Sequence, residues 1–181
     1  MLDKFDMLEC IEIQDTSGAS QFISEDGVVF SKDKKQLCLY PKNKTDQTYH
    51  IPEGTERVGY FCGNENLRHL IMPSSVKCID NQAFYQCKNL ESIQFSDNIT
   101  EFPEKMCCEC TSLKTLNMPS HLISIGRLAF QECPIQSPDF PSTLEVIHAC
   151  AFQNCPAITK LSFPTSLRQI GFGAFADCNV L

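Results

Sequence analysis

The amino-acid sequence predicts a repeat solenoid, a coil in which successive turns of one chain stack on a shared apolar core. The pattern Ala-Phe-x-x-Cys occurs four times, as "AFYQC", "AFQEC", "AFQNC" and "AFADC". Cysteines recur every 22 or 23 residues, at Cys87, Cys110, Cys133, Cys155 and Cys178. Apolar residues keep the same step, and such repeats must stack because a single turn cannot bury its own apolar side.

One repeat reads L-x-x-L-x-φ-P-x-x-L-x-x-I-x-x-x-A-F-x-x-C-x-x, where φ is an apolar residue. This period lies within the range of leucine-rich repeats. The expected fold class is therefore a leucine-rich-repeat solenoid, an α/β or mostly-β right-handed coil with a concave parallel β-sheet. It should carry short helical turns at the A-F-x-x-C segments and an N-terminal β-hairpin cap.

Residues 1–48 are expected to form this cap, because the end of a solenoid otherwise exposes its core. Within the cap, "DGVVF" and "QLCLY" flank "SKDKK" and predict the hairpin. Residues 49–181 form the predicted solenoid, one degenerate coil followed by five repeats. Leu181 is in register with the first residue of a sixth repeat, so we expect a solenoid truncated at its C-terminus. An uncapped last coil exposes a strand edge, which predicts end-to-end self-association.

Each coil is expected to begin with a strand and to turn at a proline. In "LRHLIMP", period-2 alternation places Leu70 and Met72 inward. The proline can only follow the strand, because it lacks the N–H group that a parallel ladder needs. The second apolar pair, exemplified by Leu122 and Ile125, should line the opposite wall. In the A-F-x-x-C turn, alanine permits close approach and phenylalanine fills the centre of the coil.

The chain contains 12 cysteines, which raise the question of disulfides or a metal site. In the repeat column, cysteine is expected as a small buried residue with a weak S–H donor, because stacked side chains point in parallel and a disulfide needs converging Cβ atoms. "CCEC" offers Cys107 and Cys110 as a pair for zinc, but structural zinc needs four ligands and no second pair is present. Cys108 is expected to be exposed. A disulfide within the cap stays open, among Cys10, Cys38 and Cys62.

The sequence offers no catalytic, cofactor-binding or metal-binding residues. Four histidines occupy different columns of the repeat, without a nucleophile motif such as G-x-S-x-G nearby. The formal net charge of -7 and the missing basic stripe argue against nucleic acid as a partner. No apolar run approaches the roughly 20 residues that span a bilayer. We therefore predict a protein that is not an enzyme, uses no cofactor and does not insert directly into a membrane.

Function is expected on the outward side of the predicted strands, where side chains have no packing role. This stripe is polar, small and nearly neutral, and it lacks the aromatic anchors that dominate tight interfaces. Such a face fits weak contacts that add up over many repeats; a merely solvated face is the alternative. The concave binding face is predicted to comprise His69, Ile71, Ser92, Gln94, Thr115, Asn117, Ser137, Asp139, Lys160 and Ser162.

These columns as a set resemble the BspA-like leucine-rich-repeat proteins. The clearest segments are "FPTSLRQIGFGAFADC" and "MPSHLISIGRLAFQEC", and the upstream "DGVVFSKDKKQLCLYPKN" is similar to a hairpin unit that often precedes repeats in this family. "MCCEC" in the second repeat and Pro138 at a strand position depart from the pattern. The resemblance implies a surface or secreted protein of a bacterium or a parasitic protist, associated with adhesion, and brings no common catalytic residues.

We therefore expect a non-catalytic interaction module that binds a protein or glycan ligand, at the cell surface or outside the cell according to the resemblance. The alternative is an intracellular scaffold or adaptor built on the same solenoid. It is favoured by the absence of a recognisable signal peptide and by cysteines that the pattern predicts to be reduced.

Overall fold

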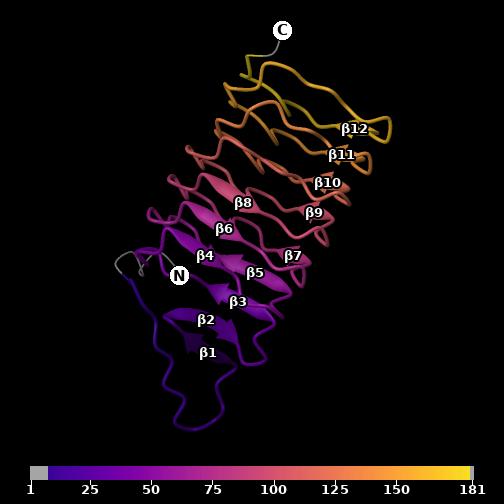
Figure 1. Ribbon diagram of the computed structural model, residues 1–181. Helices are drawn as coiled ribbons and strands as arrows, with labels where there is room; N and C mark the ends of the chain where they lie inside the picture. The colour runs from indigo at the N-terminus through magenta and orange to yellow at the C-terminus, as the bar shows by residue number, and fades with distance from the viewer. Residues whose placement is uncertain (1–7, 180–181) are drawn as a thin grey trace.

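The computed structural model describes residues 8–179, so residues 1–7 of the predicted cap and the repeat start predicted at Leu181 lie outside the described residues. Figure 1 shows coils stacked in one direction, from the hairpin near β1 to β12. Residues 8–179 contain no helix, and thus none that could cross a membrane. Their strands are β1 (Phe22–Glu25), β2 (Val28–Ser31), β3 (Gln36–Leu39), β4 (Thr48–His50), β5 (Arg57–Tyr60), β6 (His69–Ile71), β7 (Cys78–Ile79), β8 (Ser92–Gln94), β9 (Glu101–Phe102), β10 (Ser124–Ile125), β11 (Val146–Ile147) and β12 (Gln169–Ile170).

The strand segments expected at the start of each coil form a parallel sheet in the order β4-β6-β8. Leu70 pairs in register with its equivalents in the coils on either side, and Gln94 makes an isolated parallel bridge to Asn117 in the next coil. The predicted parallel sheet is thereby confirmed. Beyond the bridge the segments have no regular pairing, because Pro138 stands beside Leu116 and lacks the N–H that a ladder requires.

The opposite wall is a second row of strands. β9 to β12 form a four-stranded parallel sheet, in which Ile125 pairs with Phe102 and with Ile147. These three side chains are at most 1% exposed. The apolar residues of this wall were predicted from the sequence. Its strands were not predicted, because each strand contains only two residues.

The predicted hairpin is present at the N-terminal end. β2 and β3 pair antiparallel, and β1 adds a further antiparallel strand on the outside. β3 pairs in parallel with β5, which places Leu37 beside Val58. The hairpin therefore extends the second wall of the solenoid into one sheet, with the order β1-β2-β3-β5-β7.

The helical turns predicted at the A-F-x-x-C segments are not confirmed, since these segments contain no helix. In "AFYQC", the amide of Tyr85 donates to the carbonyl of Gln82 within the coil, whereas the amide of Phe84 donates to Met106 in the next coil at 2.9 Å. Gln82 and Gln86 have positive φ values of 60° and 57°, a left-handed conformation that a right-handed helix excludes. Because alternate amides serve the neighbouring coil, the segment is a chain of turns.

Phenylalanines stack through the centre of the coils, as the repeat predicts. Phe130 and Phe152 lie with ring centroids 5.3 Å apart, and both are fully buried. The second repeat lacks this ring because Cys107 occupies the phenylalanine position. The ring of Phe102, from β9 in the second wall, instead packs against the ring of Phe130, with 5.5 Å between the ring centroids. A large residue in a neighbouring column thus compensates for the missing ring and keeps the core filled.

Candidate functional site

The outward side chains of the first strand row are accessible to solvent, whereas the residues between them are buried in β6 and β8. On β6, Leu70 is 1% exposed between the half-buried His69 and Ile71. The other eight members of the predicted face are half-buried or exposed: Ser92, Gln94, Thr115, Asn117, Ser137, Asp139, Lys160 and Ser162. Alternation along the strand therefore leaves this set of residues without a role in the core.

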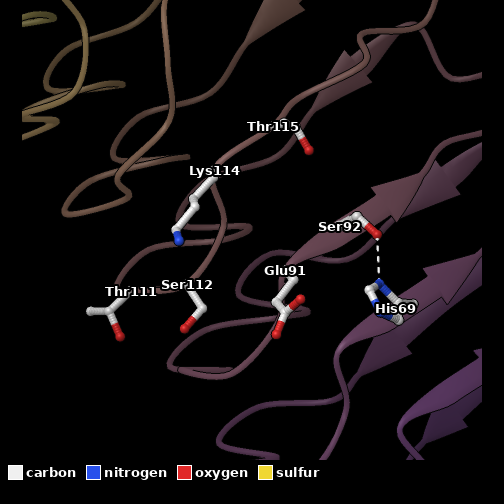
Figure 2. Close-up of a pocket in the computed structure, with 7 residues that line it drawn as sticks. All are labelled: His69, Glu91, Ser92, Thr111, Ser112, Lys114 and Thr115. Atoms are coloured by element: carbon white, nitrogen blue, oxygen red, sulfur yellow. Dashed lines mark hydrogen bonds between the residues drawn. The ribbon is translucent and has the colours of Figure 1, made fainter.

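Part of this face is hollowed into a pocket of about 570 Å³ (Figure 2). Three members of the predicted face line it, and the other seven do not. Four further lining residues were missed by the sequence prediction, because they precede the strand or lie in the turn before it. The complete lining is His69, Glu91, Ser92, Thr111, Ser112, Lys114 and Thr115.

Two polar contacts fix one side of the pocket. The Nδ1 atom of His69 lies 2.9 Å from the hydroxyl oxygen of Ser92 in the next coil. The guanidinium of Arg68 donates to the carboxylate of Glu91 at 2.5 Å, which balances the charge of that carboxylate. Lys114 occupies the position of Glu91 in the next coil, and it has no ion pair among residues 8–179. The pocket thus contains a paired anion and an unpaired cation.

The histidine and serine do not constitute a catalytic triad. A nucleophilic serine needs a base that a third group orients through its other ring nitrogen. Within the described residues no carboxylate is hydrogen bonded to His69, and the nearby Glu91 is held by Arg68. The pair bridges two coils, as many other side-chain contacts of the solenoid do.

The cysteine column is hydrogen bonded throughout and is buried except at Cys178, which is half-buried. The thiol of each column cysteine donates to the carbonyl of the phenylalanine position in the preceding coil, for example Cys133 to Cys107 at 3.0 Å. Burial raises the pKa of the Cys133 thiol well above its usual value. The expected core role is therefore accompanied by a specific bond, repeated from coil to coil at Cys87, Cys110, Cys155 and Cys178.

Cys108 was predicted to be exposed, and that prediction was wrong: it is 3% exposed. Its column also holds Tyr85 and Gln131, whose longer side chains flank the short thiol, and the Sγ atom lies 3.5 Å from the amide oxygen of Gln131. Burial raises the pKa of the Cys108 thiol to about 11. No group of metal-ligating residues suited to an ion occurs among residues 8–179. Cys10 and Cys38, two of the residues considered for a disulfide in the cap, are thiols.

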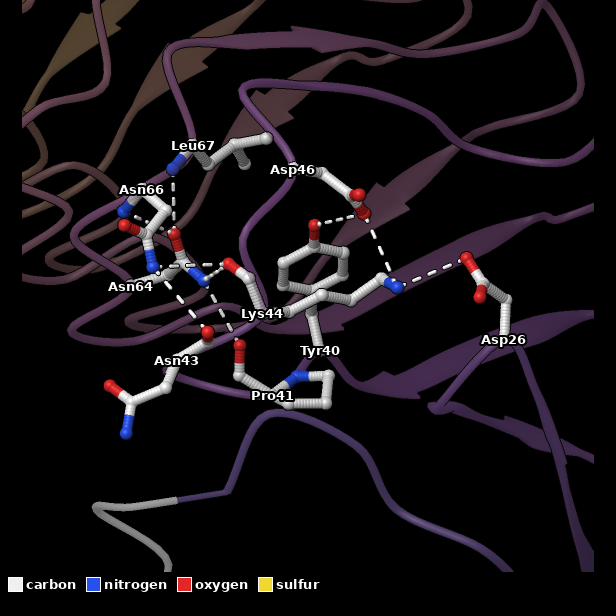
Figure 3. Close-up of polar contacts among 9 residues, drawn as sticks. All are labelled: Asp26, Tyr40, Pro41, Asn43, Lys44, Asp46, Asn64, Asn66 and Leu67. Atoms are coloured by element: carbon white, nitrogen blue, oxygen red, sulfur yellow. Dashed lines mark hydrogen bonds and ion pairs between the residues drawn. The ribbon is translucent and has the colours of Figure 1, made fainter.

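The column of cysteines begins with an asparagine at the junction with the hairpin (Figure 3). Asn64 is fully buried and lies 23 residues before Cys87. Its amide nitrogen donates to the carbonyls of Pro41 and Lys44 at 3.0 and 3.2 Å, and its oxygen accepts from the amide of Leu67 at 2.7 Å. Asparagine can thus bond the irregular cap segment on one side and its own coil on the other.

A second polar cluster joins this segment to the hairpin. The ammonium group of Lys44 lies 3.0 Å from Asp26 and 3.4 Å from Asp46, and the Tyr40 hydroxyl donates to Asp46 at 2.9 Å (Figure 3). Burial, followed by the bond to Asp46, raises the pKa of Tyr40 well above its usual range. These contacts support the cap and leave the strand-face pocket as the candidate binding site.

Comparison with known proteins agrees with this architecture. Residues 42–159 and 145–181 match the family described as BspA type leucine rich repeat region, in six copies. A leucine-rich repeat protein from Eubacterium ventriosum has a similar structure, with 26% sequence identity and a TM-score of 0.78 over 97% of this chain and 54% of that chain. A search of curated proteins gave no match.

Two further structures are also similar. A leucine-rich repeat protein from Bacteroides ovatus is 27% identical, with a TM-score of 0.72, over 87% of this chain and 42% of that chain. A leucine rich cell surface protein from Faecalibacterium prausnitzii is 27% identical, with a TM-score of 0.64, over 88% of this chain and 38% of that chain. The chain therefore spans about half the length, or less, of these three proteins.

Leucine-rich repeats typically serve as protein-interaction modules and are in general non-catalytic. The neighbour described as a cell surface protein agrees with a surface location for this group. The six repeat matches, the stacked parallel strands and the recurring buried cysteines together show that this chain belongs to the BspA-type leucine-rich-repeat family.

Proposed function

We propose that this protein is a non-catalytic interaction module of a microbial surface, which binds a protein or glycan ligand through the outward face of β4, β6, β8 and the following coils. The observation that carries the proposal is the row of accessible polar side chains on this face, hollowed into the pocket around Lys114. The face lacks aromatic anchors, so affinity comes from many weak contacts along the coils.

The test is a binding screen with immobilised extracellular-matrix proteins and with intact cells. A strand-face variant carries Gln94→Arg and Asn117→Arg, two exposed positions in neighbouring coils. A control variant carries Thr100→Arg, next to β9, and Gln169→Arg, in β12; both positions are also exposed, and the change in net charge is the same. Binding that only the strand-face variant loses supports the proposal; no binding to any surface or matrix protein contradicts it.

A second candidate is an intracellular scaffold on the same solenoid. The observation that favours it is that the buried column cysteines Cys87, Cys110, Cys133 and Cys155 are thiols, as is usual in a reducing compartment. Labelling of intact cells with a membrane-impermeant reagent separates the two candidates. Labelled protein supports the surface assignment, and protein that becomes labelled only after lysis supports the scaffold.

We also propose self-association through the last described coil. Phe163, Ile170 and Phe172 are 41%, 47% and 91% exposed, whereas Ile147, the residue equivalent to Ile170 in the preceding coil, is fully buried. A coil that exposes several large apolar residues is the kind of surface through which proteins associate. Sedimentation velocity over a range of concentrations tests this, with Phe172→Ser as the variant. A monomer at every concentration for the unmodified chain contradicts the proposal.

A further inference from the structure

We propose that the strand-face pocket binds a carboxylate-bearing sugar residue, such as a uronic acid of an acidic glycan. This inference rests on the proposed function, because it names the ligand chemistry of the same face. It is carried by the arrangement of one unpaired cation, one paired carboxylate and a set of hydroxyl groups around a pocket of about 570 Å³.

Lys114 provides the site for the acidic group. Its ammonium has no ion pair within residues 8–179, and Figure 2 shows its side chain reaching along the pocket toward the side that carries Thr111 and Ser112. A charge-assisted hydrogen bond to a carboxylate is about twice as strong as a neutral one. One unpaired ammonium group in this pocket, on a chain with a net charge of -7, suits one acidic group better than a polyanion.

The hydroxyl lining suits a sugar. Ser112 and Thr115 each carry a hydroxyl that can donate one hydrogen bond and accept others, whereas the hydroxyl of Ser92 already shares one hydrogen bond with His69. Sugar hydroxyls also both donate and accept hydrogen bonds, so a serine or threonine hydroxyl can pair with a sugar hydroxyl in either direction. The spacing of the coils presents these groups from two successive turns of the solenoid, as Figure 2 shows.

Glu91 argues against an acidic peptide as the ligand. Its carboxylate accepts hydrogen bonds and donates none, so it suits the O–H groups of a sugar. An aspartate or glutamate side chain brings no such donors next to its charge, whereas a uronic acid carries hydroxyl donors beside its carboxylate. The pocket also has no apolar or aromatic residue of the kind that anchors a peptide side chain.

The experiment is a titration of the isotope-labelled, unmodified chain, followed by amide chemical shifts. Three probes are used: methyl glucuronoside, methyl glucoside, which has a hydroxymethyl group in place of the carboxylate, and N-acetylglutamate amide, which has the carboxylate without sugar hydroxyls. The glucuronoside should bind at least about fivefold more tightly than either of the others, with shifts at Ser92, Ser112 and Thr115.

The variant Lys114→Met should weaken glucuronoside binding roughly five- to tenfold, because the charge-assisted bond is lost. Lys88→Met is the matched control: Lys88 is exposed, lies outside the pocket and makes the same change in net charge. Its affinity for the glucuronoside should equal that of the unmodified chain.

Equal binding of the glucoside, or an unchanged affinity in Lys114→Met, overturns the assignment of the acidic group. Equal binding of N-acetylglutamate amide overturns the sugar and assigns the pocket to an acidic side chain of a protein. If no probe binds while the strand-face variant still abolishes binding to cells, the pocket inference fails and the proposed function stands.

Discussion

Replacing Asn64 with alanine should destabilise the junction between the hairpin and the first coil. The side chain makes four hydrogen bonds: to the carbonyls of Pro41 and Lys44, and from the amides of Asn66 and Leu67, at distances of 2.7 to 3.2 Å. Each such bond contributes about 1 kcal/mol net, so the variant should lose ~4 kcal/mol.

The assay is equilibrium urea unfolding followed by circular dichroism, with hydrogen exchange to locate the effect. With an m-value of ~2 kcal/mol/M, a loss of ~4 kcal/mol lowers the midpoint by ~2 M. Exchange should accelerate first at Leu67 and in the hairpin, because stability in a solenoid is the sum of local and nearest-neighbour terms.

Asn66→Ala is the matched control, since its side chain is half-buried and its two bonds are longer, at 3.5 and 3.3 Å. It should lose ~1 kcal/mol or less. If Asn64→Ala and Asn66→Ala unfold at the same urea concentration, the junction does not depend on the buried amide and the reasoning is refuted.

Two further predictions concern the cysteine column. Cys133→Ala should lose ~2 kcal/mol, because it removes one buried heavy atom and the thiol hydrogen bond to the carbonyl of Cys107, which keeps only the amide of Cys110 as a donor; the exposed Cys78→Ala should unfold like the unmodified chain, and equal midpoints for both variants contradict the prediction. The second prediction concerns alkaline pH. Burial raises the pKa of the Cys87, Cys107 and Cys133 thiols well above the ordinary value of 9.0, so above that pH the unfolded chain releases protons that the folded chain retains. This contribution to the free energy of unfolding is complete below pH 9.0. Above that pH the free energy of unfolding falls by up to roughly 4 kcal/mol per pH unit for three thiols. Urea midpoints that do not change between about pH 8 and pH 10 contradict this prediction.

The repeat allowed the core to be predicted from the sequence, because residues one period apart occupy the same place in successive coils. Ala83, Phe84 and Cys87 are all fully buried, as their columns predict. The hairpin could also be predicted, since two apolar runs flank a short polar segment. Periodicity thus identifies which residues stack.

Periodicity does not identify which backbone groups bond to each other. The helical turn predicted at A-F-x-x-C is not confirmed, and local sequence cannot reveal that the amide of Phe84 bonds to the next coil. Cys108 was wrongly predicted as exposed because its burial depends on the longer side chains of neighbouring coils. Lys114 and Glu91 were missed as pocket residues because they fall outside the strand pattern, although their column holds a charge in three successive coils.

The measurement that tests the proposed function most directly is the binding of three proteins to one cell surface: the unmodified chain, the strand-face variant and the second-wall control. Flow cytometry of cells incubated with each fluorescently labelled protein gives the apparent affinities. The account predicts that Gln94→Arg with Asn117→Arg reduces affinity at least about tenfold, equivalent to about 1.4 kcal/mol, and that Thr100→Arg with Gln169→Arg does not. Equal affinity for all three, or loss only in the control, would contradict a binding face on β4, β6 and β8.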